Sequence, residues 1–147
     1  MPTAFRLATD ADIDVYRAWF ADPVLAGRLS EPTPDWRRHV RTEGCALWVA
    51  LDDQSRPVAF FQTETDEHGM WIDAAIDPAR RGQGRMAAIL RDFLAGPMAD
   101  AQHVIAEVEA DNAASLALLV RCGFVEQPRP ATPGFRRFEL TRPGRGS

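Results

Sequence analysis

The sequence contains no lysine, because all 17 of its basic residues are arginine. Catalysis through a lysine Schiff base is therefore excluded, since that chemistry needs a side-chain amine. Cysteine and histidine are also scarce, and the chain holds only Cys45, Cys122, His39, His68 and His103. These residues are far apart in the sequence and lack metal-ligand spacing, so no metal site is predicted. Both cysteines adjoin apolar segments, which favours buried free thiols over a disulfide.

Long hydrophobic runs and a positive net charge are missing as well. No apolar run approaches the length of a membrane span, and residues 1–8 lack the pattern of a signal peptide, so we expect a cytoplasmic protein. The net charge of −4 argues against a broad surface for nucleic acids or anionic membranes. With 147 residues, 46% of them hydrophobic, the chain is expected to form a single domain over 1–147, with a frayed tail at 142–147.

What the sequence does contain is a glycine-rich turn between an expected strand and an expected helix. Apolar residues over 71–76 lead into the segment DPARRGQGRM at 77–86, and apolar side chains then recur at helical spacing over 86–94. Backbone N–H groups in such a turn, and at the helix N-terminus behind it, point at one spot and bind anions. We interpret the segment as a phosphate-binding loop; a tight turn with solvated arginines is the alternative.

The patterns along the rest of the chain predict an α+β fold. Expected strands cover 4–8, 45–51, 57–63, 70–76, 103–109, 124–127 and 135–140, and expected helices follow Thr9, cover 35–41, follow the glycine turn and cover 113–121. Thr9 and Asp12 match a capping box at the first helix. Turns join the early strands, which makes them antiparallel, whereas a crossover helix joins 70–76 to 103–109 and makes those strands parallel. The sheet is therefore expected to be mixed.

A second motif follows the glycine turn at 107–124, where the sequence reads E-V-x-x-x-N-x-x-S-x-x-L-x-x-x-C-G-F. Together with R-x-x-G-x-M at 81–86, it resembles the GNAT superfamily of acyl-CoA-dependent N-acetyltransferases. The resemblance covers roughly 45–124. It implies a GNAT-like mixed, mostly antiparallel sheet of about six or seven strands, flanked by about four helices, with a splayed parallel strand pair at the centre.

The resemblance also implies acetyl-CoA as a co-substrate. In this family the glycine turn holds the pyrophosphate, an arginine can reach the terminal phosphate, and the strand before the turn pairs with the pantetheine arm. The residues that would bind the cofactor are Ala75, Ile76, Arg80, Arg81, Gly82, Gln83, Gly84, Arg85, Met86, Asn112 and Ser115. Two positions depart from the family pattern. Met86 replaces a small residue, and Leu119 stands where many members have a tyrosine that protonates the leaving thiolate.

Acetylation of an amine needs a base, because an amine with a pKa near 10 arrives protonated. Glu107 is the first candidate, since N-terminal acetyltransferases of ribosomal proteins look similar there and use a glutamate; a solvent-facing carboxylate is the alternative. Asp73 is the second, because it interrupts an apolar strand and a buried carboxylate is costly unless it is used or paired. Trp36, Glu64 and Trp71 are candidates for the acceptor site, with core packing or a solvated strand end as alternatives.

The expected function is transfer of an acetyl group from acetyl-CoA to a primary amine by direct attack in a ternary complex. No covalent intermediate is expected, since neither cysteine is placed like an activated nucleophile. The acceptor can be a small molecule, an amino acid or a protein N-terminus, because the loops over 25–34 and 128–134 vary freely on this scaffold. A catalytically silent acyl-CoA-binding or regulatory domain is the alternative. Relatives also suggest a homodimer through the late strands.

Overall fold

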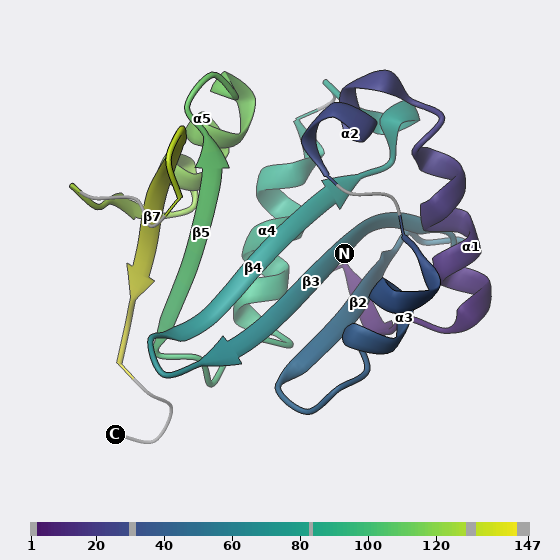
Figure 1. Ribbon diagram of the computed structural model, residues 1–147, viewed down its shortest axis with the longest axis horizontal. Helices are drawn as coiled ribbons and strands as arrows, with labels where there is room; N and C mark the ends of the chain where they lie inside the picture. Colours follow the sequence, from purple (N-terminus) through teal and green to yellow (C-terminus); the bar gives the residue numbers. More distant parts are fainter. Residues whose placement is uncertain (1–2, 30–31, 83, 129–131, 144–147) are drawn as a thin grey trace.

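The structure, a computed structural model, describes residues 3–29, 32–82, 84–128 and 132–143 (Figure 1). Within these residues seven strands form one sheet in the order β1-β2-β3-β4-β5-β7-β6. The strands are β1 (Ala4–Leu7), β2 (Cys45–Leu51), β3 (Pro57–Asp66), β4 (Gly69–Ile76), β5 (His103–Glu109), β6 (Val125–Glu126) and β7 (Phe135–Thr141). All neighbours are antiparallel except β4 and β5, which are parallel. The expected mixed, mostly antiparallel sheet is confirmed.

Five α-helices and a short 3-10 helix flank this sheet within the described residues. They are α1 (Asp10–Trp19), α2 (Pro23–Arg28), α3 (Pro34–His39), η1 (Pro78–Arg80), α4 (Arg85–Ala95) and α5 (Ala113–Arg121). The capping box of Thr9 and Asp12 at the start of α1 is confirmed.

Helix α2 was not expected from the sequence, which indicated about four helices. The sequence interpretation took the pair Asp22-Pro23 as the end of the preceding helix. In the structure the same pair also begins the next helix. The Asp22 side chain accepts a hydrogen bond from the Leu25 N–H, and Pro23 occupies the first turn, where its missing N–H has no cost. The interpretation of 25–34 as a loop was therefore wrong for its first part.

The sheet has a hydrophobic core on each face. Successive side chains of a strand point to opposite faces, so the neighbours Phe60 and Phe61 of β3 belong to different cores. Phe60 packs with Tyr16 of α1 beneath α1–α3, and Phe61 stacks on Phe93 of α4 with ring centroids 4.1 Å apart. In Figure 1, α4 runs behind the sheet, while α2 and α3 lie in front of it. The two helical layers thus enclose the central strands.

The parallel pair at the centre of the sheet separates along its length. β4 and β5 pair only at Met70↔Val104 and Trp71↔Ile105. Beyond these positions β4 stays paired with β3 as far as Ile76, while β5 follows β7 as far as Glu109. The two strands therefore diverge toward their carboxyl ends (Figure 1). The splayed pair that the resemblance implies is confirmed, and it opens the sheet beside the glycine turn.

Two expectations about the whole chain can be compared with the described residues. Both cysteines are free, and each is partly rather than fully buried. None of the helices in the described ranges has the length and apolar character that crossing a membrane requires.

Candidate functional site

The glycine turn connects β4 to α4 at the point where the central strands diverge. Gly82 and Gly84 have φ angles of 80° and 69°, a region in which residues with a side chain are strained. A Cβ at either position would meet no atom within 4 Å, so both glycines face open space. Gly84 caps α4 without a side-chain hydrogen bond, which leaves the first N–H groups of the helix available to an anion. Gln83, also predicted here, lies outside the described residues.

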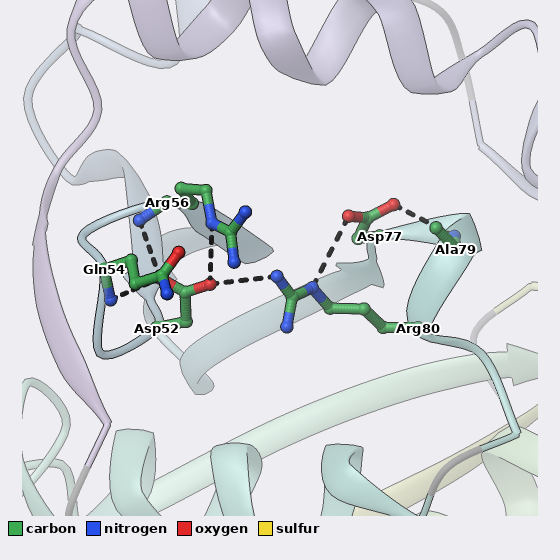
Figure 2. A network of polar contacts seen from close by, with 6 residues as sticks. All are labelled: Asp52, Gln54, Arg56, Asp77, Ala79 and Arg80. Atoms are coloured by element: carbon green, nitrogen blue, oxygen red, sulfur yellow. Dashed lines mark hydrogen bonds and ion pairs between the residues drawn. The ribbon is translucent and has the colours of Figure 1, made fainter.

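Arg80 is held in place by two carboxylates (Figure 2). Its Nη2 lies 2.9 Å from Asp52 Oδ2, and its Nε lies 3.6 Å from Asp77 Oδ2. Asp77 also accepts a hydrogen bond of 3.0 Å from the Ala79 N–H, which fixes the first part of the turn. Arg80 therefore ties the turn between β2 and β3 to the glycine turn.

The other two arginines of the turn differ in their partners. Arg81 pairs with Asp22 at the start of α2, with Nη2 and Oδ2 2.8 Å apart. Arg85 has an exposed side chain, and no carboxylate of the described residues pairs with it. Of the three arginines, Arg85 is thus the one whose charge is available to a bound phosphate.

The ion pair between Asp52 and Arg80 is expected to depend on pH. The backbone N–H groups of Arg56 and Gln54 donate hydrogen bonds to the Asp52 carboxylate. Together with the positively charged Arg56 side chain, these bonds lower the Asp52 pKa from 3.8 to about 2. A lowered pKa stabilises the folded state above the ordinary value, and this stabilisation is lost as pH falls toward the folded-state pKa. We expect Asp52→Asn to reduce stability above pH 3.8, with the deficit disappearing near pH 2.

Urea unfolding of both proteins across this pH range measures the deficit. Asp53→Asn, at the exposed neighbouring position, is the matched control and should follow the wild type at every pH. A deficit for Asp52→Asn that stays constant down to pH 2 would contradict the account of the Asp52 pKa.

A cleft of about 820 Å³ lies beside the glycine turn, within the size range of small-molecule sites. The predicted cofactor residues that line it are Ile76, Arg80, Arg81, Gly82, Gly84, Arg85, Met86 and Asn112. Leu116 and Leu118 of α5 and Val24 and Arg28 of α2 complete much of the wall. Two predicted residues lie outside the lining. Ala75 is buried in the core beneath α1–α3, and the Ser115 N–H donates to Asn112 Oδ1 at 3.3 Å.

A smaller recess of about 110 Å³ occupies the gap between the diverging ends of β4 and β5. Asp73 and Ala74 of β4 line one side, and Glu107 and Glu109 of β5 line the other. Arg28, Asn112 and Leu118 line both the recess and the cleft, so the two spaces adjoin. The structure thus places both predicted catalytic carboxylates next to the predicted cofactor cleft.

Asp73 has an unusual electrostatic environment. It is exposed to solvent, yet it also lines the recess between β4 and β5. Desolvation by the surrounding protein raises the Asp73 pKa, and the carboxylates of Glu107 and Glu64 raise it further. A carboxylate with a raised pKa accepts a proton more readily, which is the property expected of a general base.

Glu107 and Glu109 each have a polar partner. Glu107 Oε1 accepts a hydrogen bond of 2.7 Å from Thr132 Oγ1, and Glu109 Oε2 lies 2.9 Å from Arg28 Nη1. The sequence interpretation missed Glu109 and Arg28 as lining residues. Glu109 shares the alternation of Glu107 along β5 and could have been found from it, whereas Arg28 has no local signal.

The three predicted acceptor residues lie beside Asp73 on the same face of the sheet. Gln62 pairs with Asp73 across β3 and β4, and Glu64 pairs with Trp71 two residues along. Trp36 reaches this face from α3, where its Nε1 donates to Gln62 Oε1 at 3.1 Å. Trp36, Glu64 and Trp71 are all described, and none lines the cleft or the recess.

Leu119 is buried and lines the recess, so the side chain at the position of the family's tyrosine faces the site without a proton to donate. The single tyrosine of the chain, Tyr16, is buried beside Phe60. Burial, with a smaller contribution from Asp73, raises the Tyr16 pKa. A thiol with a pKa of about 8.5 can leave without an acid.

Comparison with known families identifies one match. A model described as the acetyltransferase (GNAT) family matches residues 13–124, which is most of the chain. None of the curated proteins compared with the chain matches it.

Solved structures with the same fold include several N-acetyltransferases. The aminoglycoside acetyltransferase AAC(6')-Ib, solved with coenzyme A and kanamycin, aligns over 95% of both chains with a TM-score of 0.80 and 16% identity. Spermidine N-acetyltransferase from Vibrio cholerae, solved with CoA and spermine, aligns over 95% of both chains with a TM-score of 0.77 and 14% identity. A putative phosphinothricin N-acetyltransferase aligns over 95% of this chain and 98% of its own, with a TM-score of 0.73 and 22% identity. At these identities the likeness shows the fold.

Proposed function

The chain belongs to the GNAT acetyltransferase family, and from this membership we propose that it transfers the acetyl group of acetyl-CoA to a primary amine of a small molecule in a ternary complex. The observation that carries the proposal is the junction between the glycine-lined cleft and the carboxylate-lined recess. The two spaces meet at Asn112 and Leu118, so a cofactor in the cleft can present its acyl end to the recess.

The residues of the cleft fit coenzyme A. The turn offers uncapped N–H groups of α4 to the pyrophosphate, and the absence of side chains on Gly82 and Gly84 allows close approach of the backbone. Arg85 supplies a positive charge for a further phosphate. The diverging edge of β4 can pair with the pantetheine arm, as β-strand edges pair with extended ligands. Coenzyme A in the solved relatives supports this assignment.

The carboxylates around the recess favour an amine as the acceptor. Asp73 and Glu107 line it, and Glu64 lies close enough to Asp73 to raise its pKa, whereas Arg28 balances the charge of Glu109. Such a concentration of negative charge attracts an ammonium group and disfavours anionic acceptors. Kanamycin and spermine, which are bound in the solved relatives, each carry several amino groups and support a small cationic acceptor.

In the proposed reaction Asp73 takes a proton from the bound ammonium, and the free amine attacks the thioester carbonyl. The C–N bond forms and the C–S bond breaks. The nitrogen gives its second proton to the departing sulfur, which leaves as a thiol, or to solvent, in which case the sulfur leaves as a thiolate. Backbone N–H groups on the unpaired edge of β4 could donate hydrogen bonds to the carbonyl oxygen, which becomes negatively charged. We assign the base to Asp73 before Glu107 because Asp73 has the raised pKa, whereas Glu107 is hydrogen-bonded by Thr132.

A substitution of Arg85 tests the terminal phosphate contact. Arg85→Ala should weaken CoA binding about 10-fold, since one hydrogen bond to a charged group contributes about 1.5 kcal/mol. Calorimetric titration with CoA and with CoA lacking its terminal phosphate measures the effect, and the two ligands should bind the variant almost equally. Arg91→Ala, also on α4 but bonded to the Arg121 carbonyl, is the matched control. An equal loss of affinity for both ligands would show that Arg85 does not contact the terminal phosphate.

The release of free thiol from acetyl-CoA tests the activity itself. We expect release in the presence of polyamines, aminoglycosides or simple primary amines, with stoichiometric formation of the acetylated amine. Saturable CoA binding without turnover on any member of the panel would instead indicate the silent acyl-CoA-binding domain.

A further inference from the structure

Three potential metal ligands that are distant in the sequence meet beside the acceptor face. His39 is the last residue of α3, Cys45 is the first residue of β2, and Glu64 is the cross-strand partner of Cys45 on β3. They form the one group of three such residues with converging ligand atoms that the described part of the chain contains. The sequence predicted no metal site because these residues lack metal-ligand spacing along the chain. They meet only because β2 pairs with β3 and α3 ends beside them.

The distances between the three ligand atoms suit one tetrahedral ion. Cys45 Sγ lies 3.8 Å from His39 Nε2 and 3.7 Å from Glu64 Oε1, and Nε2 and Oε1 are 3.6 Å apart. Zinc bonds of about 2.3 Å to sulfur and about 2.0–2.1 Å to nitrogen and oxygen place tetrahedral ligands roughly 3.3–3.6 Å apart. Shifts of a few tenths of an ångström would therefore let a single ion contact all three atoms.

The same geometry argues against a nucleophilic thiol. In a catalytic Cys-His-carboxylate chain, one imidazole nitrogen contacts the thiol and the other contacts the carboxylate. Here Cys45 and Glu64 both approach the same atom, His39 Nε2. The three groups thus converge on one point, as the ligands of one ion do, and do not form a proton relay.

Local hydrogen bonds connect the His39 end of α3 to the start of β2. The His39 carbonyl accepts hydrogen bonds from both the N–H and the hydroxyl of Thr42, and the Cys45 N–H donates to the Thr42 carbonyl. The His39 and Glu64 side chains are 49% and 51% exposed, so water can supply a fourth ligand. Three protein ligands with one open position, including sulfur and imidazole, favour zinc over magnesium or calcium.

We propose that His39 Nε2, Cys45 Sγ and Glu64 Oε1 bind Zn²⁺ or a similar divalent transition metal ion. The ion would connect α3 to β2 and β3, and β3 is the strand that pairs with Asp73-bearing β4. Glu64 is also a candidate for attracting the acceptor ammonium, so the ion and the acceptor would compete for this carboxylate. That consequence rests on the proposed function, whereas the metal site does not.

Titration of the reduced protein with Co²⁺ tests the site without any assay of activity. A thiolate ligand gives Co²⁺ a charge-transfer absorption, and we expect this band to saturate at one equivalent. Cys45→Ala should abolish the band and weaken binding at least about 100-fold, since even outer-sphere partners change affinity 10- to 100-fold. His39→Ala and Glu64→Ala should weaken binding while the band is retained.

The control variants separate this site from adventitious binding. Cys122→Ala and His68→Ala remove a thiol and an imidazole outside the group and should bind Co²⁺ as the wild type does. No charge-transfer band in the wild type, or a band that survives in Cys45→Ala, would overturn the proposal.

The effect of Zn²⁺ on acetyl transfer tests the consequence separately. We expect Zn²⁺ to raise the acceptor KM of the wild type and to leave that of Cys45→Ala unchanged. If the protein binds Co²⁺ but Zn²⁺ leaves the acceptor KM unaltered, the metal site would stand and the proposed competition for Glu64 would be wrong. A protein without transferase activity would reject the proposed function and leave the Co²⁺ result decisive for the site.

Discussion

Asp73→Asn is expected to lower kcat/KM for the acceptor by about 10²- to 10⁴-fold, the contribution typical of a general base. The amide has nearly the shape of the carboxylate but cannot take the ammonium proton. Affinity for CoA should change little, because Asp73 lines the recess and not the cleft. Steady-state kinetics and CoA titration of the variant measure both quantities.

The stability of Asp73→Asn distinguishes a catalytic from a structural role. A carboxyl with a raised pKa in the folded state costs stability once pH exceeds its ordinary value of 3.8, because the folded protein must give up a proton it holds tightly. Removing the charge should therefore raise the melting temperature at neutral pH. Lost activity in a more stable protein supports the assignment, whereas lost activity with lost stability would indicate a structural aspartate.

Glu107→Gln provides the matching pH experiment. The Glu107 charge contributes to the raised pKa of Asp73, so its removal should lower that pKa. The acidic limb of the kcat/KM profile reports ionisation of the base and should move to lower pH in Glu107→Gln while turnover persists. Loss of turnover at every pH would instead make Glu107 the base, and retained turnover with an unmoved acidic limb would contradict the assignment of that limb to Asp73.

Gly84→Val should weaken CoA binding about 100-fold, the second large effect we expect. Valine is strained at the φ of 69°, and its side chain would extend into the open space beside the turn. The backbone could then no longer approach the pyrophosphate, and the loss of two charge-assisted hydrogen bonds of about 1.5 kcal/mol each gives this factor. Calorimetry with CoA provides the measurement.

Gly134→Val is the matched control for backbone strain. Gly134 also has a positive φ, 84°, and a Cβ at this position would likewise meet no atom within 4 Å, but the residue lies outside the cleft lining. Both variants should lose stability, and only Gly84→Val should lose CoA affinity. Equal CoA affinity in the two variants would contradict the placement of the pyrophosphate.

Much of the fold could be predicted because local residues specify it. Thr9 and Asp12 specify the start of α1, and the glycine turn with its following apolar spacing specifies the end of β4 and the course of α4. Helix α2 was missed because Asp22-Pro23 has two local meanings, the end of one helix and the start of another.

The candidate site was less predictable because its contacts join distant segments. Arg28 and Glu109 are 81 residues apart in the sequence, and no periodicity signals their ion pair. The partners of Arg80 and Arg81 were equally hidden, since Asp52 and Asp22 belong to separate elements. Residue type alone therefore indicated three available arginines, whereas packing leaves Arg85 as the one without a carboxylate partner among the described residues.

A crystal structure of the complex with CoA tests the central claim most directly. We expect the pyrophosphate on the backbone N–H groups of the glycine turn and the sulfur at the gap between β4 and β5, within reach of the recess that holds Asp73. A pyrophosphate bound away from the turn, or a sulfur directed away from Asp73, would contradict the account.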